Sequence, residues 1–177
     1  MVQFLRNKSE FGEMSMKKLI IITSFLILVV SLTACSIGEH TPKDYFGFHK
    51  EDFIVLDEAD THSGFHGDGS YHLILDCSEN KEKATKILSE WIKLPISENL
   101  ELILYGGEKD GISYGYNLAK EAEIPKIENG YYYFYDRHSE SMDSKDTSAL
   151  FDRGSFNFSF AIYDSDTDKM YYFEYDT

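Results

Sequence analysis

The segment from Ser155 to Asp164 carries the pattern that most restricts how the chain can fold. Bulky apolar residues alternate there with small or polar ones, in the order Ser-Phe-Asn-Phe-Ser-Phe-Ala-Ile-Tyr-Asp. A period of two is typical of an antiparallel β-strand with one face in the core and the other in water. Residues 164–169 have the composition of a turn, and residues 170–175 return as another strand. The sequence therefore predicts a β-hairpin over these residues.

One amphipathic helix is predicted over residues 78–93. Ser78 has the side chain of an N-cap residue, and Pro95 is expected to stop the helix. Apolar residues recur between them at the spacing of one helical face. They are Ala84, Ile87, Leu88, Trp91 and Ile92.

Further strands are expected at 52–57, 70–77, 99–105 and 130–136, with a short helix within 116–123. A strand, a helix and another strand in succession are compatible with a parallel right-handed crossover. The fold class that follows is α+β. We expect a mixed or mainly antiparallel sheet of about five to six strands, with one main helix on one face.

Charge and composition limit the possible functions. The chain of 177 residues has 17 Lys and Arg against 31 Asp and Glu, a formal net charge of −14. Such an acidic surface repels phosphate backbones, so a nucleic-acid partner is disfavoured. Aromatic residues make up 15% of the chain, too many for a disordered acidic tail.

The N-terminal region has the organisation of a secretory signal. Met16-Lys17-Lys18 forms a positive segment, and the apolar run 19–30 is shorter than a membrane-spanning helix requires. The following Leu32-Thr33-Ala34-Cys35 resembles the lipobox of bacterial lipoproteins. That resemblance implies cleavage before Cys35, a diacylglyceryl group on its thiol and anchoring on the extracytoplasmic face of the membrane. An uncleaved anchor helix is the alternative.

The same organisation divides the chain into four parts. We expect translation to start at Met16, a signal peptide over 16–34, a tether over 35–45 and a single α+β domain over 46–177, with 1–15 outside the protein. Loss of residues 1–34 removes four basic and two acidic residues. The remaining 13 Lys and Arg against 29 Asp and Glu give a net charge of −16. This charge favours cationic partners outside the cell.

The predicted domain resembles small uncharacterised bacterial lipoproteins with tyrosine-rich hairpin endings, and this resemblance implies no activity. In strand 130–136, Tyr131, Tyr133 and Tyr135 share one face. Exposed aromatic rings are enriched at interfaces, although sheets also carry tyrosine on a wet face. Our first hypothesis is a non-enzymatic binding module, such as an immunity or inhibitor protein that captures a cationic partner at this face.

The second hypothesis is a small metal-dependent enzyme. His62, His66 and Asp68 lie close together in the chain, with Asp60 and His72 nearby, and imidazole and carboxylate ligands suit zinc. Glycines between them argue against a helix that would bring the two histidines together. A polar surface loop that enters a strand explains the same residues.

Three other motifs are better explained by structure than by chemistry. Residues 164–168 carry Asp at alternate positions, as a calcium loop does, but Lys169 and Tyr175 replace the required Gly and Glu, which favours a solvated turn. Residues 111–115 match the G-x-S-x-G pattern of a nucleophile elbow, yet their glycines also suit a turn. Cys77 lies on the apolar face of a predicted strand, where a buried and unreactive thiol is expected.

Overall fold

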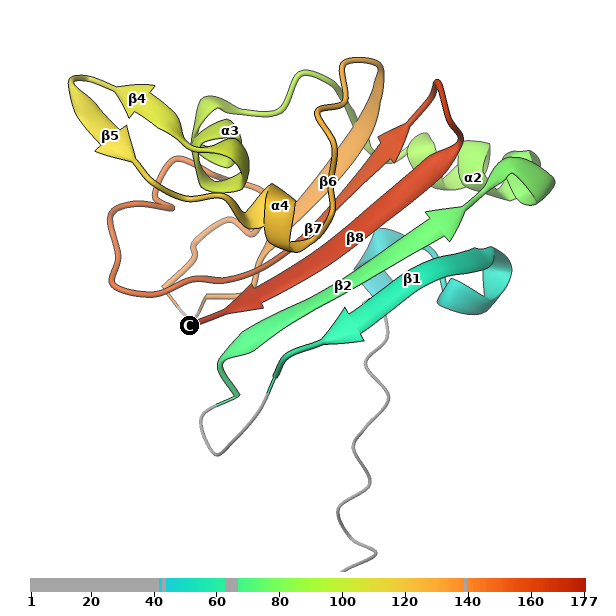
Figure 1. Ribbon diagram of the computed structural model, residues 1–177, viewed down its shortest axis with the longest axis horizontal. Helices are drawn as coiled ribbons and strands as arrows, with labels where there is room; N and C mark the ends of the chain where they lie inside the picture. The colour runs from blue at the N-terminus through green and yellow to red at the C-terminus, as the bar shows by residue number, and fades with distance from the viewer. Residues whose placement is uncertain (1–41, 43, 63–66, 139) are drawn as a thin grey trace, which may run out of the picture. The chain divides into compact units, whose positions relative to one another are not determined.

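Six antiparallel strands form the central sheet, in the spatial order β1-β2-β8-β7-β6-β3 (Figure 1). This computed structural model describes residues 42, 44–62, 67–138 and 140–177. The strands of the sheet are β1 (Ile54–Asp60), β2 (Gly69–Asp76), β3 (Ile92–Lys93), β6 (Gly130–Asp136), β7 (Asn157–Asp164) and β8 (Lys169–Asp176). The predicted α+β class and the hairpin of β7 with β8 are confirmed, but no pair of strands in this sheet is parallel.

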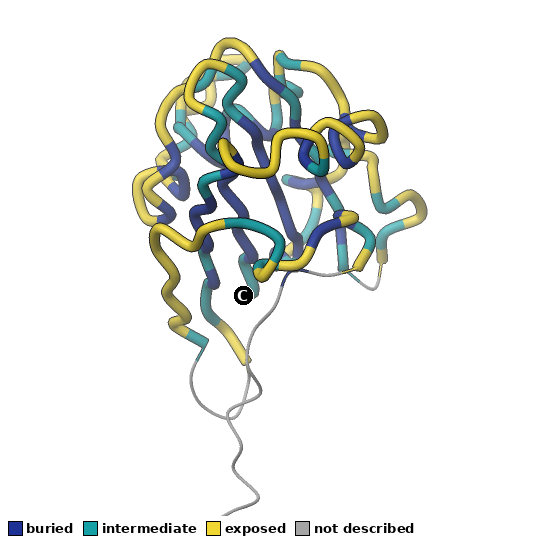
Figure 2. The backbone as a smooth tube through the Cα atoms, turned by 90° about the vertical axis from the view of Figure 1, so that its right-hand side faces the viewer, coloured by how far each residue is buried: buried dark blue, intermediate teal, exposed yellow. Residues whose placement is uncertain are grey.

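Both faces of the sheet are buried at β7, which corrects the expectation that one face of this strand is wet. Phe158, Phe160 and Ile162 point into one core, as the alternation predicts. Ser159 and Ala161, on the other face, are also fully buried. These small side chains are present because bulky aromatic groups from outside the sheet pack against that face. Figure 2 shows the buried strands at the centre of the domain.

The helix α2 (Lys81–Leu88) and the short 3-10 helix η1 (Asp44–Phe46) cover one face. Two further 3-10 helices, η2 (Lys50–Asp52) and η3 (Ser78–Asn80), contain no buried residue. The predicted helix 78–93 is therefore too long at both ends. The chain leaves α2 before Pro95 because residues 92–93 pair with β6 as strand β3. The predicted apolar stripe is buried as far as Trp91, whereas Ile92 is 47% exposed. Phe46 is 1% exposed and Tyr45 stacks on β6, so the domain includes part of the predicted tether.

The other face is covered by the helices α3 (Glu98–Tyr105) and α4 (Leu118–Glu121). The expected strand 99–105 is wrong, because this segment is helical. The Ser97 side chain accepts a hydrogen bond from the Leu100 backbone N–H, and Gly106 ends the helix with a φ of 71°. Glu98 and Glu101 lie in the first turn, where carboxylates interact favourably with the helix dipole.

Two smaller elements complete this side of the domain. Strands β4 (Gly107–Lys109) and β5 (Ile112–Tyr114) form a separate hairpin, where a turn region was expected. Its two turn residues, Asp110 and Gly111, have φ values of 53° and 76°, which suits a two-residue hairpin turn. The predicted helix within 116–123 is present as α4. The hairpin and both helices lie on the same side of the sheet (Figure 1).

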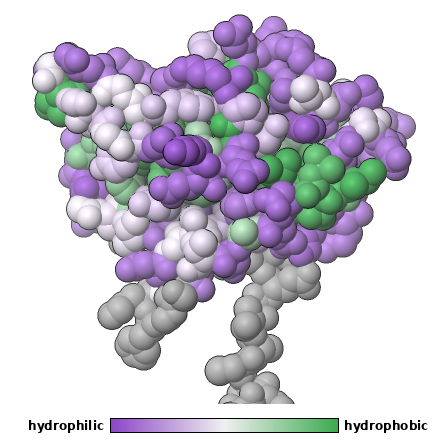
Figure 3. Space-filling model, viewed as in Figure 1, coloured by the Kyte–Doolittle hydropathy of each residue, from purple (hydrophilic) through white to green (hydrophobic). Residues whose placement is uncertain are grey.

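Strand β1 forms an open edge of the sheet. All seven of its residues are exposed, and it lies beside β2 with an irregularity in register between Val55 and Asp57. The expected strand 52–57 is thus shifted along the chain. Ile54, Val55 and Leu56 are 43–47% exposed, and they form an apolar patch between hydrophilic neighbours (Figure 3).

Candidate functional site

The three tyrosines predicted as an interaction face lie on β6, on the α2 side of the sheet, and are half-buried. We call Tyr131, Tyr133 and Tyr135 the aromatic face. Tyr135 is stacked beneath Tyr45, with ring centroids 3.8 Å apart and planes 18° from parallel. Tyr133 contacts Phe46, with centroids 5.1 Å apart. Tyr45 and Phe46 therefore cover the Tyr135 end of this face. We call residues 44–48, which include them, the N-terminal segment.

Two hollows flank Trp91 along the uncovered part of the aromatic face. One has a volume of about 490 Å³ and is lined by Tyr131 and Trp91, with Leu88 and Tyr163. The other, of about 330 Å³, is lined by Tyr133, Trp91, Tyr45 and Phe46, among others. Trp91 is 7% exposed, and its indole N–H donates to the Phe46 carbonyl oxygen at 3.3 Å. The indole thus forms a rigid wall between the two hollows.

Lysines surround this face in an otherwise acidic domain. The Lys145 ammonium lies 5.2 Å from the centroid of the Tyr133 ring, within cation–π range. Lys83 is ion-paired with Asp52 at 2.5 Å, and Lys86 with Glu82 at 2.9 Å. These pairs leave the rim of the hollows close to neutral. Apolar and hydroxyl contacts, rather than charge, therefore dominate what the aromatic face offers to a ligand.

A buried polar cluster lies beneath Tyr45. Glu174 is 1% exposed and accepts a hydrogen bond from the Tyr172 hydroxyl. The Arg137 guanidinium donates to Ser159 Oγ at 2.9 Å and to Asp176 Oδ2 at 3.1 Å. Burial raises the pKa of Tyr172, and the Glu174 carboxylate raises it further. Since these polar groups bond to one another, the cluster is explained by its structural role of joining β7, β8 and the N-terminal segment.

The predicted metal ligands are only partly brought together. His62 Nδ1 lies 2.7 Å from Asp60 Oδ1, and His62 Nε2 lies 3.1 Å from Asp176 Oδ2. Asp68 is exposed in the loop before β2, and His66 lies outside the described residues. Within the described ranges, no group of three or more His, Cys, Asp or Glu side chains is arranged to hold a metal ion.

The calcium-like segment is the turn between β7 and β8, and its carboxylates bond within the protein. Asp164 accepts from the Thr167 hydroxyl at 2.7 Å, and Asp166 accepts from the Asn129 amide at 2.9 Å. The Lys81 ammonium and the Tyr163 hydroxyl hold the pKa of Asp168 below its usual value. These interactions give the three aspartates a structural role in the turn and its hairpin.

The remaining reactive candidates lie apart from one another. Ser113 of the G-x-S-x-G pattern is on β5 and pairs across its hairpin with Glu108, so it lies within a strand and not on the strand-to-helix turn that a nucleophile elbow requires. His138 Nε2 instead lies 3.0 Å from Ser155 Oγ. Cys77 is fully buried, and burial raises the pKa of its thiol to about 12, as expected for an unreactive cysteine.

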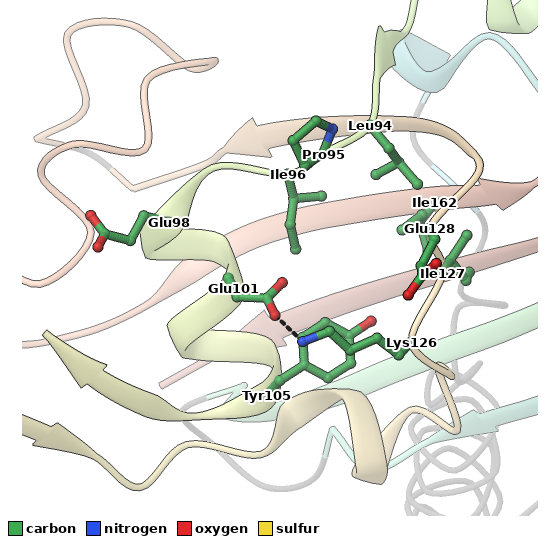
Figure 4. A pocket seen from close by; sticks show the side chains of 10 residues that line it. All are labelled: Leu94, Pro95, Ile96, Glu98, Glu101, Tyr105, Lys126, Ile127, Glu128 and Ile162. Carbon is green, nitrogen blue, oxygen red and sulfur yellow. Dashed lines mark hydrogen bonds and ion pairs between the residues drawn. The ribbon is translucent and has the colours of Figure 1, made fainter.

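The structure also contains a hollow that the sequence did not indicate. It has a volume of about 500 Å³ and lies between residues 94–96, helix α3 and residues 126–128, with Ile162 of β7 as its floor. Figure 4 shows Leu94, Ile96 and Ile127 lining this space and the Glu101–Lys126 ion pair above Tyr105. We call it the apolar hollow. Its walls come from two stretches of the chain, 94–105 and 126–128, and its floor comes from a third, so no local sequence pattern predicts such a site.

The predicted signal peptide, the lipobox with Cys35 and the start at Met16 lie outside the described residues. In the part of the chain that the structure describes, no helix is long and apolar enough to cross a membrane. No protein-family model matches the chain, and no curated protein or solved structure matches it.

Proposed function

We propose that this protein is a non-enzymatic binding module, anchored through a lipid on Cys35 to the extracytoplasmic face of the membrane, and that it binds its partner at the aromatic face. The observation that carries the proposal is the pair of hollows on either side of Trp91, each with one tyrosine of the face in its wall. Half-buried tyrosines combine a large apolar surface with a hydroxyl group and lose little side-chain entropy on binding, which is why they are enriched at interfaces.

The partner we propose is a cationic protein or envelope ligand. The net charge of −16 beyond residue 34 attracts cations over a distance of several ångströms and accelerates encounter. The near-neutral aromatic face then supplies short-range apolar contacts. Long-range attraction and local contact are thereby performed by different parts of the surface.

Site-specific photo-crosslinking in cells tests the binding face. A photoreactive phenylalanine derivative replaces Tyr131 or Tyr133 of the full chain, and Ile112, which is 57% exposed on the separate hairpin, serves as the control position. We expect a discrete adduct from positions 131 and 133 that is absent at 112 and weaker at raised salt. Equal labelling at all three positions, or no adduct at any, would contradict the proposal.

The proposed anchor has its own test. Cells fed an alkyne-bearing fatty acid should label the protein, and Cys35→Ser should abolish labelling. Cys77→Ser is the matched control, because that thiol is fully buried in the domain. N-terminal analysis of the processed protein should find cleavage before Cys35. Continued labelling of Cys35→Ser would show that the lipobox resemblance is misleading.

A further inference from the structure

On the opposite side of the sheet from the aromatic face, we propose that the apolar hollow binds a peptide segment that places an aliphatic side chain next to a lysine or arginine. This is a second binding site, independent of the function proposed above. The hollow has aliphatic walls and an acidic rim, and the protein itself holds a cation there.

The walls of the hollow suit aliphatic groups. Leu94, Ile96, Tyr105 and Ile127 are each partly buried and pack against the core on the α3 side. Ile162 beneath them is 1% exposed, so the floor belongs to that core. A volume of about 500 Å³ falls within the range of sites that enclose small ligands. An apolar side chain that enters exchanges water for these walls.

The rim of the hollow is acidic. It carries the carboxylates of Glu98, Glu101 and Glu128 against two ammonium groups, Lys126 in the lining and Lys109 beside it, so one carboxylate is in excess. Glu101 is paired with Lys126, and Glu98 with Lys109 at 2.8 Å. Glu128 is exposed, and within the described part of the chain no cationic group lies within ion-pair distance of it. A ligand with a carboxylate or phosphate would be repelled at this rim, whereas a cation would be attracted.

Lys126 shows how a cation is accommodated at this hollow. Its ammonium contacts the Glu101 carboxylate and lies 5.0 Å from the centroid of the Tyr105 ring, as Figure 4 shows. An ammonium group on an aliphatic stem thus contacts a carboxylate and an aromatic ring at the same time. The peptide that we propose places its own lysine or arginine beside Glu128 and the neighbouring aliphatic side chain in the hollow. Charge complementarity therefore selects a cationic amphipathic segment over an acidic one.

The test uses the full chain in nanodiscs of zwitterionic lipid and methyl NMR of isoleucine. The probe is a capped four-residue peptide that alternates leucine with lysine, and the comparison peptide has glutamate in place of lysine. We expect the lysine peptide to shift the methyl signals of Ile96, Ile127 and Ile162 saturably, while Ile54 on the exposed edge strand stays unchanged. The glutamate peptide should leave all four signals unchanged.

Charge variants make the test specific. The double variant Glu98→Gln and Glu128→Gln should weaken binding of the lysine peptide by about threefold to tenfold, the range expected for exposed ion pairs. Glu108→Gln, the same exchange on the separate hairpin, should have no effect on binding. Neither change removes a buried group, so folding is retained.

Three results would overturn the proposal. They are equal shifts with the two peptides, shifts at Ile54 in place of the hollow, and a self-associated form in which a second copy of the chain already covers these methyl groups. Because these readouts do not involve Tyr131 or Tyr133, they leave the proposed function of the aromatic face untouched.

Discussion

On the α3 side of the sheet, β7 and β8 present Phe158, Phe160 and Phe173, whereas on the α2 side they present Ser159, Ala161 and Tyr172. Both sets are buried. On the first side, the phenylalanines of β7 and β8 pack against apolar side chains from helices α3 and α4. The second side has small residues on β7, and aromatic rings from the N-terminal segment and from Trp91 fill the space above them. Small residues in an alternating strand therefore do not by themselves indicate a wet face.

This difference also separates the two candidate binding surfaces. The α2 side contains hydroxyl groups and a buried glutamate, and its hollows are walled by aromatic rings. The α3 side contains aliphatic walls beneath an acidic rim. The two sides should therefore differ in packing, polarity and charge, and substitutions on each side measure these differences.

The largest expected loss of stability follows from a cavity made in the core on the α3 side. Phe160 is fully buried, so Phe160→Ala should lower the free energy of unfolding by about 3–5 kcal/mol. Urea unfolding followed by circular dichroism measures the loss. Ile112→Ala, at a position 57% exposed on the hairpin, is the control and should change little. A loss below about 1 kcal/mol for Phe160→Ala would show that the core on this side is loosely packed.

Enlarging a small residue tests the α2 side. Ala161 is fully buried against aromatic rings, so Ala161→Leu should overpack it and cost about 1–3 kcal/mol of unfolding free energy. The same exchange at Ala59, on the exposed edge strand, should stay within about 0.5 kcal/mol. If Ala161→Leu were as harmless as Ala59→Leu, that face of β7 would be accessible to water after all.

Substitution of two neighbouring tyrosines tests whether the α2 and α3 sides of the sheet differ in polarity. The Tyr172 hydroxyl donates to buried Glu174, whereas Tyr171 points into the core on the α3 side. Removing a donor from a buried carboxylate is costly, so Tyr172→Phe should lower the free energy of unfolding by about 1–3 kcal/mol. Tyr171→Phe should cost less, and the difference between the two urea midpoints is the measurement. Equal losses would mean that the hydroxyl–carboxylate contact contributes nothing specific.

Much of the sheet could be predicted from the sequence, because β6, β7 and β8 combine a period of two with β-forming residues. The alternation of Leu100, Leu102 and Leu104 predicts a strand where helix α3 lies, because its eight residues fit both periods. The capping residue Ser97, the acids of the first turn and Gly106 were the signals that distinguish a helix. Leucine, moreover, is a strong helix former.

The candidate sites show more clearly how little a local sequence pattern says about tertiary contacts. Tyr131 and Tyr133 could be named from alternation within one strand. That Tyr135 would be covered by Tyr45 depends on a contact between residues 90 positions apart in the chain, which no local pattern reports. The apolar hollow depends on two stretches of the chain, 94–105 and 126–128, meeting over Ile162. Periodicity describes which face a side chain takes, but not what tertiary packing brings against that face.

The pH dependence of stability tests the covered end of the aromatic face. Burial raises the pKa of Tyr45 to about 12 from 10.0. The folded state thus holds its proton more tightly than the unfolded state. Its contribution is complete below pH 10 and is lost as pH rises from 10 towards 12, by about 1 kcal/mol or less at pH 11. Tyr45→Phe should flatten this decline in urea midpoints measured between pH 8 and 11. An unchanged decline would assign it to other groups, such as the Cys77 thiol.

The smallest expected effect on stability is at the rim of the apolar hollow. Glu128 is exposed and lacks an ion-pair partner in the described part of the chain, so Glu128→Gln should change the free energy of unfolding by less than about 0.5 kcal/mol. The same variant should weaken binding of the leucine–lysine peptide, measured by the Ile127 methyl shift. Buried Glu174 is held within the protein by Tyr172, whereas the carboxylate of Glu128 is available to a ligand. If Glu128→Gln lowered stability and left peptide binding unchanged, Glu128 would have a structural role and the rim would have no part in recognition.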